Sequence, residues 1–197
     1  MHSILKPAVL LVSLGVALSA YPQTKAVNRI TQAIDDRETI QLRGTVHPML
    51  QRGSDQGRMD GGMRLEGVSL VFKRTAAQDA AAEKLAAEQQ DSSSPNYHKW
   101  LTPEQYADRF GLTTDDLNKV VAWLQAQGFT VNRVTRGRDQ VFFTGTVSQI
   151  ETIFRTEMHR YQVDSEPHFA MAVEPAIPAA LSEVVLGLHN VSNFRPK

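Results

Sequence analysis

Hydrophobic and polar residues alternate in several short stretches of the chain, and this two-residue period is typical of β-strands. In the stretch over residues 63–73, the predicted core positions are Leu65, Val68, Leu70 and Phe72. Turn residues at 136–139 separate two further stretches and predict a β-hairpin. The six predicted strands cover residues 39–47 (with Ile40 and Leu42 on one face), 63–73, 129–134, 140–145, 157–163 and 168–173.

Other stretches carry the signals of helices. Residues 76–90 are rich in alanine, which has the highest helix propensity. Thr102, Pro103 and Gln105 have the spacing of an N-cap, a first-turn proline and a capping-box partner, so a short helix begins there. Thr113 or Thr114 starts a second helix that Gly128 ends. Two shorter helices are expected over residues 146–154 and 179–186.

The order of these elements predicts an α+β fold. Strand, helices, hairpin, helix and strand in succession indicate a ferredoxin-like split β-α-β arrangement, an antiparallel sheet with helices on one face. Residues 51–62 contain four glycines and are expected to form a flexible surface loop. Residues 21–38 form a polar lead-in, in which a single helical turn around residues 30–34 is an option.

The first 20 residues have the pattern of a secretory signal peptide. Lys6 precedes an apolar run over residues 8–18, and the small residues Ser19 and Ala20 follow. The apolar run is too short to span a bilayer comfortably. The pattern predicts a secreted protein, extracellular or periplasmic, without a membrane part after cleavage. The alternative is an uncleaved membrane anchor.

Composition and motifs narrow the possible functions. The 197 residues are 42% hydrophobic, and 21 basic residues balance 21 acidic ones, so a nucleic-acid partner is not expected. The absence of cysteine excludes disulfides and thiol catalysis. His159 and His168 lie on neighbouring predicted strands, but surface histidines are favoured over a hydrolase site because no nucleophile or ligand motif accompanies them. No catalytic, metal or cofactor site is therefore predicted.

Residues 97–111, YHKWLTPEQYADRFG, resemble the most recognisable motif of the pro-kumamolisin activation domain, the prodomain of sedolisin/kumamolisin-type serine-carboxyl peptidases. Further matches follow in the order of that family. The matching positions are Gly44, His47, Pro48, Tyr97, Trp100, Leu101, Thr102, Pro103, Phe110, Gly111, Trp123, Gly128, Phe129, Gly145, Phe154, Tyr161 and Pro178. We expect the large apolar residues Trp100, Phe110, Trp123, Phe129, Phe142 and Phe154 to be core anchors.

The resemblance implies a subtilisin-propeptide-like activation domain over residues 39–190, with a tail at 191–197. Such a propeptide packs against a sedolisin-type catalytic domain, assists its folding and inhibits it until the pH falls. In the family the two are joined in cis. Because the chain ends at Lys197, the catalytic domain and its calcium site are expected to lie outside it, so any partner would be met in trans.

This reading implies no enzymatic activity and no cofactor for the chain itself. Two alternatives stay open: a fragment of a longer peptidase precursor, and a free-standing secreted module that binds another protein.

Overall fold

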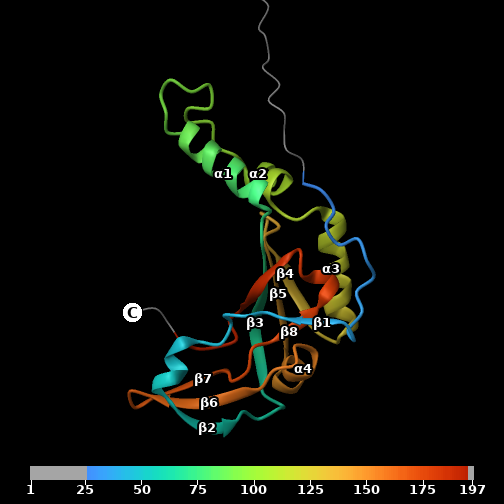
Figure 1. The fold of residues 1–197 in the computed structure, drawn as a ribbon, viewed down its shortest axis with the longest axis vertical. Helices are drawn as coiled ribbons and strands as arrows, with labels where there is room; N and C mark the ends of the chain where they lie inside the picture. The colour runs from blue at the N-terminus through green and yellow to red at the C-terminus, as the bar shows by residue number, and fades with distance from the viewer. Residues whose placement is uncertain (1–25, 195–197) are drawn as a thin grey trace, which may run out of the picture.

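The computed structural model describes residues 26–194, so the predicted signal peptide lies outside the described residues. Figure 1 shows a curved molecule in three parts. A four-stranded sheet with two helices forms the body, a helical arm projects from one end of the sheet, and a smaller second sheet lies at the other end.

The body is built on strands β3 (Arg64–Phe72), β4 (Thr130–Val134), β5 (Gln140–Thr146) and β9 (Val185–His189). They are ordered β4-β5-β3-β9, and all neighbours are antiparallel. This is the order of two interleaved split β-α-β units, and it agrees with the predicted α+β fold. The fourth strand, however, is not the one that the sequence indicated.

The predicted helix over residues 179–186 is wrong beyond its first turn. Only Ala179–Leu181 forms a 3₁₀ turn (η2), and β9 follows it along the edge of β3. In β9, Val185 and Leu188 are buried, whereas Leu186 between them is 61% exposed. The tertiary pairing with β3 thus overrides a segment whose composition also fits a helix.

The core positions predicted on β3 are confirmed, including their uneven spacing. Leu65 faces Gly145 of β5 and Val68 faces Phe143, so three steps along β3 correspond to two along β5. This register shift is a β-bulge, and Gly67 within it has a φ of +69°, a conformation that favours glycine. The bulge returns Val68, Leu70 and Phe72 to the buried face.

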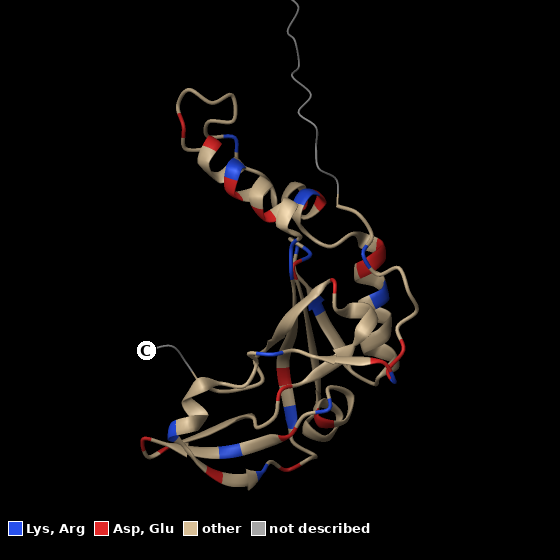
Figure 2. Ribbon diagram, viewed as in Figure 1, with Lys and Arg blue, Asp and Glu red and all other residues tan. Residues whose placement is uncertain are grey.

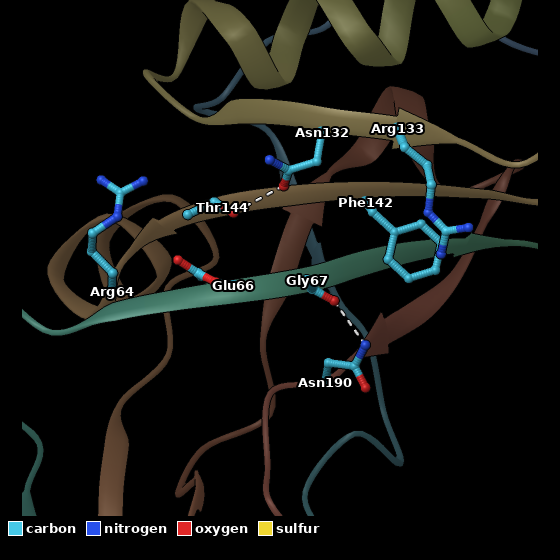
Figure 3. Close-up of a pocket in the computed structure, with 8 residues that line it drawn as sticks. All are labelled: Arg64, Glu66, Gly67, Asn132, Arg133, Phe142, Thr144 and Asn190. Carbon is cyan, nitrogen blue, oxygen red and sulfur yellow. Dashed lines mark hydrogen bonds between the residues drawn. The ribbon is translucent and has the colours of Figure 1, made fainter.

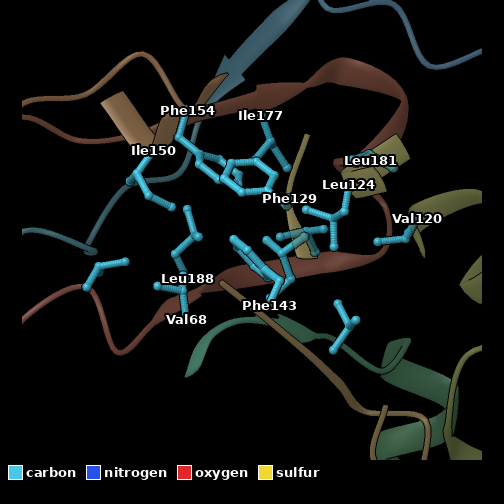
Figure 4. Packing of buried hydrophobic residues seen from close by; sticks show 14 of the residues in the cluster. Val68, Val120, Leu124, Phe129, Phe143, Ile150, Phe154, Ile177, Leu181 and Leu188 are labelled. Atoms are coloured by element: carbon cyan, nitrogen blue, oxygen red, sulfur yellow. The ribbon is translucent and has the colours of Figure 1, made fainter. Parts of the chain in front are cut away.

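Helices α3 (Thr114–Ala126) and α4 (Val147–Ile153) cover one face of the body's sheet (Figure 1). Between them and the sheet, Phe129, Phe143 and Phe154 pack together, with the Phe129 and Phe143 ring centroids 4.9 Å apart (Figure 4). Trp123 meets Phe154 edge-on at 6.0 Å. Each such side chain contributes roughly 1.5–3 kcal/mol when fully buried, so these aromatic residues are a substantial part of the core.

The polar segment before Thr39 packs along α3 and is not helical. Ile30 is 1% exposed, and the backbone N–H groups of Arg29 and Ile30 donate to the carboxylate of the fully buried Asp116 at 2.6 and 3.1 Å. The indole of Trp123 donates to Asp36 at 2.8 Å. We call residues 26–38 the strap, because these contacts hold it across α3.

After the strap, β1 (Thr39–Gln41) is much shorter than the predicted strand and pairs with β8 (Ala176–Pro178). Of the two residues predicted on one face of this strand, Leu42 is buried but lies after the end of β1, and Ile40 is 39% exposed.

The second sheet contains β2 (Ser54–Arg58), β6 (Met158–Val163) and β7 (Glu166–Met171), preceded by the 3₁₀ turn η1 (Pro48–Arg52). The prediction of a flexible loop over residues 51–62 is wrong, because β2 forms a strand paired with β6. Every residue of β2 is exposed, so it carries no apolar alternation and its strand depends on backbone hydrogen bonds to β6. Strand β6, expected in the main sheet, lies here instead.

The arm consists of α1 (Ala76–Glu88), α2 (Pro103–Phe110) and the segment between them. Both helices begin with a capping box, Thr75 with Gln78 and Thr102 with Gln105. Figure 1 shows that α1 and α2 extend past the end of the sheet, so they do not cover its face with α3 and α4. Within residues 26–194, the helices lack the length and apolar character needed to cross a membrane.

Candidate docking surface

The face of the body's sheet opposite α3 and α4 carries no helix among the described residues (Figures 1 and 3). A shallow depression of about 610 Å³ lies on it. Its lining comes from three strands and from the turn after the fourth. The lining residues are Arg64, Glu66, Gly67, Asn132, Arg133, Phe142, Thr144 and Asn190. We call this surface the open face.

Side chains on the open face are fixed by contacts to one another. The Arg133 guanidinium lies 4.1 Å from the centre of the Phe142 ring, in a cation–π contact. Thr144 donates to Asn132 at 2.9 Å. Asn190 donates to the carbonyl of Gly67 at 2.7 Å and so ties the end of β9 to the bulge of β3 (Figure 3). The result is a preformed surface of mixed polarity, which suits the docking of another protein.

A second group of polar residues lies on the second sheet. His159 contacts Asp55 through Nδ1 at 2.7 Å and Glu157 through Nε2 at 3.3 Å. Two hydrogen bonds hold the pKa of Asp55 below its usual value. The larger effect comes from the backbone N–H of Gly57 and the smaller one from His159. Burial raises the pKa of the neighbouring Tyr161.

The histidines predicted on neighbouring strands do lie on β6 and β7, where His168 faces Tyr161. His168 stacks on Phe194, with ring centroids 4.1 Å apart, and its Nε2 lies 3.8 Å from Glu166. In the part of the chain that the structure describes, no three acidic or histidine side chains gather closely enough to hold a metal ion. This group is therefore best described as an ionic network in which the carboxylates are exposed, whereas the side chains of His159 and His168 are each only 15% exposed.

The motif residues in the body are packing and turn positions. Trp123, Phe129 and Phe154 are buried. Gly128 follows α3 with a φ of +83°, as a helix C-terminus requires. Gly145 lies under the Phe129 ring, where a Cβ would come within 2.5 Å of a ring carbon.

The motif residues in the arm are only partly buried. Thr102 caps α2, Phe110 is 6% exposed at its end, and Gly111 follows as C-cap. Trp100, however, is 65% exposed, so its prediction as a core anchor is wrong: it lies in the segment before α2, away from the core. The remaining motif positions of the arm are Tyr97, Leu101 and Pro103.

Phe142 is a second predicted anchor outside the core. It follows β-strand alternation opposite the fully buried Phe143 and therefore faces outward.

The other motif residues lie near the second sheet and β8. Gly44, with a φ of +84°, donates its N–H to Glu174 at 2.8 Å. His47 caps η1 by accepting from the N–H of Met49, and Pro48 is the first residue of that turn. Tyr161 is buried on β6, and Pro178 ends β8.

Of the residues of the open face, the sequence singled out only Phe142, and it did so as a core anchor. A usable signal was present: on the strands over residues 64–72 and 140–146, polar residues alternate with the apolar core positions and include Glu66, which is exposed, and Thr144, which is 6% exposed. Polar residues at these positions indicate a face that no helix covers.

Comparison with known proteins agrees with this fold. The model of the family "Pro-kumamolisin, activation domain" matches residues 51–194. Xanthomonalisin from Xanthomonas sp. (strain T-22) is 37% identical over 99 residues, 49% of this chain and 12% of that protein. Sedolisin from Pseudomonas sp. (strain 101) is 26% identical over 134 residues, which cover 66% of this chain and 23% of that protein. Kumamolisin from Bacillus sp. (strain MN-32) is 22% identical over 158 residues, which cover 79% of this chain and 28% of that protein.

The matched residues are thus an activation domain, a propeptide-type unit that is not itself catalytic. The chain belongs to the pro-kumamolisin activation domain family of the sedolisin-type peptidases. It spans between 12% and 28% of the length of these three relatives.

Proposed function

We propose that this domain is the propeptide module of a secreted, acid-acting serine-carboxyl peptidase, and that it docks on the catalytic domain through the open face. The supporting observation is the open face itself, where the Arg133–Phe142 pair and Glu66 present apolar and charged groups on a rigid sheet. The catalytic domain would be met in cis within a precursor, or in trans.

Docking would both assist the folding of the catalytic domain and inhibit its peptidase activity. The native state of a large catalytic domain depends on contacts between distant parts of its chain, which form slowly. A preformed sheet face offers a template that lowers this barrier, and the docked domain then restricts access to the cleft. Figure 2 shows acidic and basic residues interspersed over the body, the arm and the second sheet, so binding would depend on local contacts more than on a long-range field.

Acid would release the complex by protonating carboxylates that are paired in the bound state. Pairing lowers the pKa of a carboxylate, so its contribution to binding is present above the free pKa and is lost as the pH falls through the bound one. Glu66 is the acidic residue that lines the depression.

The experiment adds the purified protein to the separately produced catalytic domain of xanthomonalisin, refolded from denaturant. We expect a higher refolding yield, and inhibition near pH 7 that weakens toward about pH 4. Phe142→Ser and Arg133→Glu on the open face should reduce both effects. Val27→Ser, at a 68% exposed position on the strap, should reduce neither. Unchanged yield and activity with the unmodified protein would refute the proposal.

A further inference from the structure

The open face alone is small for a stable interface. Four strands about 4.8 Å apart, with paired stretches of roughly five residues at ~3.3 Å each, cover about 300–400 Å². Each partner in a stable complex typically buries about 800 Å². Docking as proposed above therefore needs a further contact region next to the sheet.

The arm carries aromatic side chains that the fold leaves exposed. Trp100 is 65% exposed and Tyr97 is 40% exposed. They stack through His98, whose ring lies 3.8 Å from Tyr97 and 6.1 Å from Trp100. Below Trp100, a groove of about 400 Å³ runs between α1 and α2, with Leu85 and Leu101 among its lining residues. A clustered, exposed apolar surface of this kind is typical of a binding site.

Hydrogen bonds to α1 hold the aromatic segment in place. Gln89, at the end of α1, donates through its side chain to the carbonyl of Lys99 at 2.6 Å, and its own carbonyl accepts from the N–H of His98 at 3.0 Å. Asn96 donates to Glu88 at 2.7 Å. Because the segment is ordered before any partner arrives, binding through it costs little additional conformational entropy.

The arm and the sheet are joined by a surface of mixed polarity, to which Arg74, Asp79 and Arg138 contribute. A depression of about 300 Å³ lies between them, and Tyr106 and Phe110 line both this depression and the groove. On the sheet side it is lined by Val71 of β3 and the exposed Leu186 of β9. Figure 1 shows the arm inclined toward the side opposite α3 and α4, so arm and open face can contact one partner.

We propose that the arm is a second docking element for the same catalytic domain, with Trp100 and Tyr97 contacting it and the groove receiving an apolar segment of its surface. This inference rests on the function proposed above. Exposed aromatic residues that become buried at an interface often carry a large share of the binding energy. The small area of the open face and the depression that joins the arm to the same sheet at Val71 and Leu186 favour the catalytic domain as the occupant.

The test measures the Kd for the separately produced catalytic domain of xanthomonalisin near pH 7. Trp100→Ala should weaken binding by about 10- to 100-fold, as expected for an aromatic hot spot. Leu85→Asn in the groove should also weaken it. Val27→Ser, equally exposed but on the strap, is the matched control and should bind as the unmodified protein does. Thermal unfolding of each variant shows that the fold is retained.

Three outcomes would overturn the inference. If Phe142→Ser weakens binding and Trp100→Ala does not, the open face docks without the arm. If the unmodified protein does not bind at all, the proposed function fails and the arm's role with it. If light scattering shows a dimer that Trp100→Ala converts to a monomer, the arm contacts a second copy of this chain.

Discussion

Helices α1 and α3 have the same length, 13 residues, and each begins after a threonine N-cap, yet they relate to the rest of the protein in opposite ways. Gln78 is the one buried residue of α1, whereas α3 buries five. Seven of the 13 residues of α1 are alanine. In α3, Val120 and Leu124 are fully enclosed by the core.

The difference shows two ways in which a helix is stabilised. An isolated helix of this length is marginal in water, so α1 depends on its alanine content, its capping box and its contact with α2. Helix α3 depends on burial of its apolar face. Stability is therefore concentrated in the body, and the exposed aromatic residues of the arm contribute little to it.

The same leucine-to-alanine change in the two helices tests this comparison most strongly. Leu124→Ala in α3 should lower the free energy of unfolding by about 2–5 kcal/mol, because it removes contacts and leaves a cavity in the core. Leu85→Ala in α1, where the leucine is only half-buried, should cost less than about 1 kcal/mol. Urea denaturation measures both values. Equal losses would show that the arm is as important for stability as the body.

Two neighbouring aspartates in α3 test whether the strap belongs to the body. Asp116→Ala removes the acceptor of two backbone N–H groups and should cost about 2–4 kcal/mol, because an unpaired buried N–H such as that of Ile30 costs about 1–3 kcal/mol and the part-buried N–H of Arg29 costs less. Asp115→Ala breaks exposed contacts to Asn28 and Lys119 and should cost at most about 1 kcal/mol. A small effect of both changes in thermal unfolding would mean that the strap adds little to the fold.

Two glycines in the body's sheet show how tightly its buried side is packed. In Gly145→Ala the new methyl group meets the Phe129 ring, and the overpacking should cost about 1–3 kcal/mol. Gly187→Ala on the edge strand β9 has nothing within 4 Å of the new group and should be close to neutral. Chemical denaturation of the two variants measures their free energies of unfolding. Similar losses of stability in Gly145→Ala and Gly187→Ala would show that the cost at Gly145 does not come from packing against Phe129.

The smallest expected effect is the pH dependence of stability that Asp55 of the second sheet contributes. Because the pKa of Asp55 is lowered in the folded state, its contribution is present above about pH 4 and is lost as the pH falls through the folded value. Asp55→Asn should slightly lower the melting temperature near pH 6. This difference should shrink toward pH 2. A difference that grows on acidification would contradict the assignment, and Asp60→Asn, on the loop after β2, serves as a control.

Local signals in the sequence were sufficient for much of the body and for the start of α2 in the arm. The caps at Thr102 and Thr113, the stop at Gly128 and the hairpin around residues 136–139 depend on residues a few positions apart, so the sequence shows them directly. The candidate docking surface was harder to predict from the sequence. Strand alternation indicated outward positions such as Glu66, but nothing local showed that Trp100, in the arm, would lie exposed.

By itself the sequence determined the α+β class, the buried apolar stripe of α3 and the family motifs, because each is written in periodicity or in a short run of residues. Only the tertiary structure decided that β2 pairs with β6, that β9 completes the sheet and that the strap closes over Asp116. These features join residues about 90 to 120 positions apart, as in Ser69 with His189 of β9. Such pairings depend on backbone hydrogen bonds, which carry no mark of their partner in the sequence.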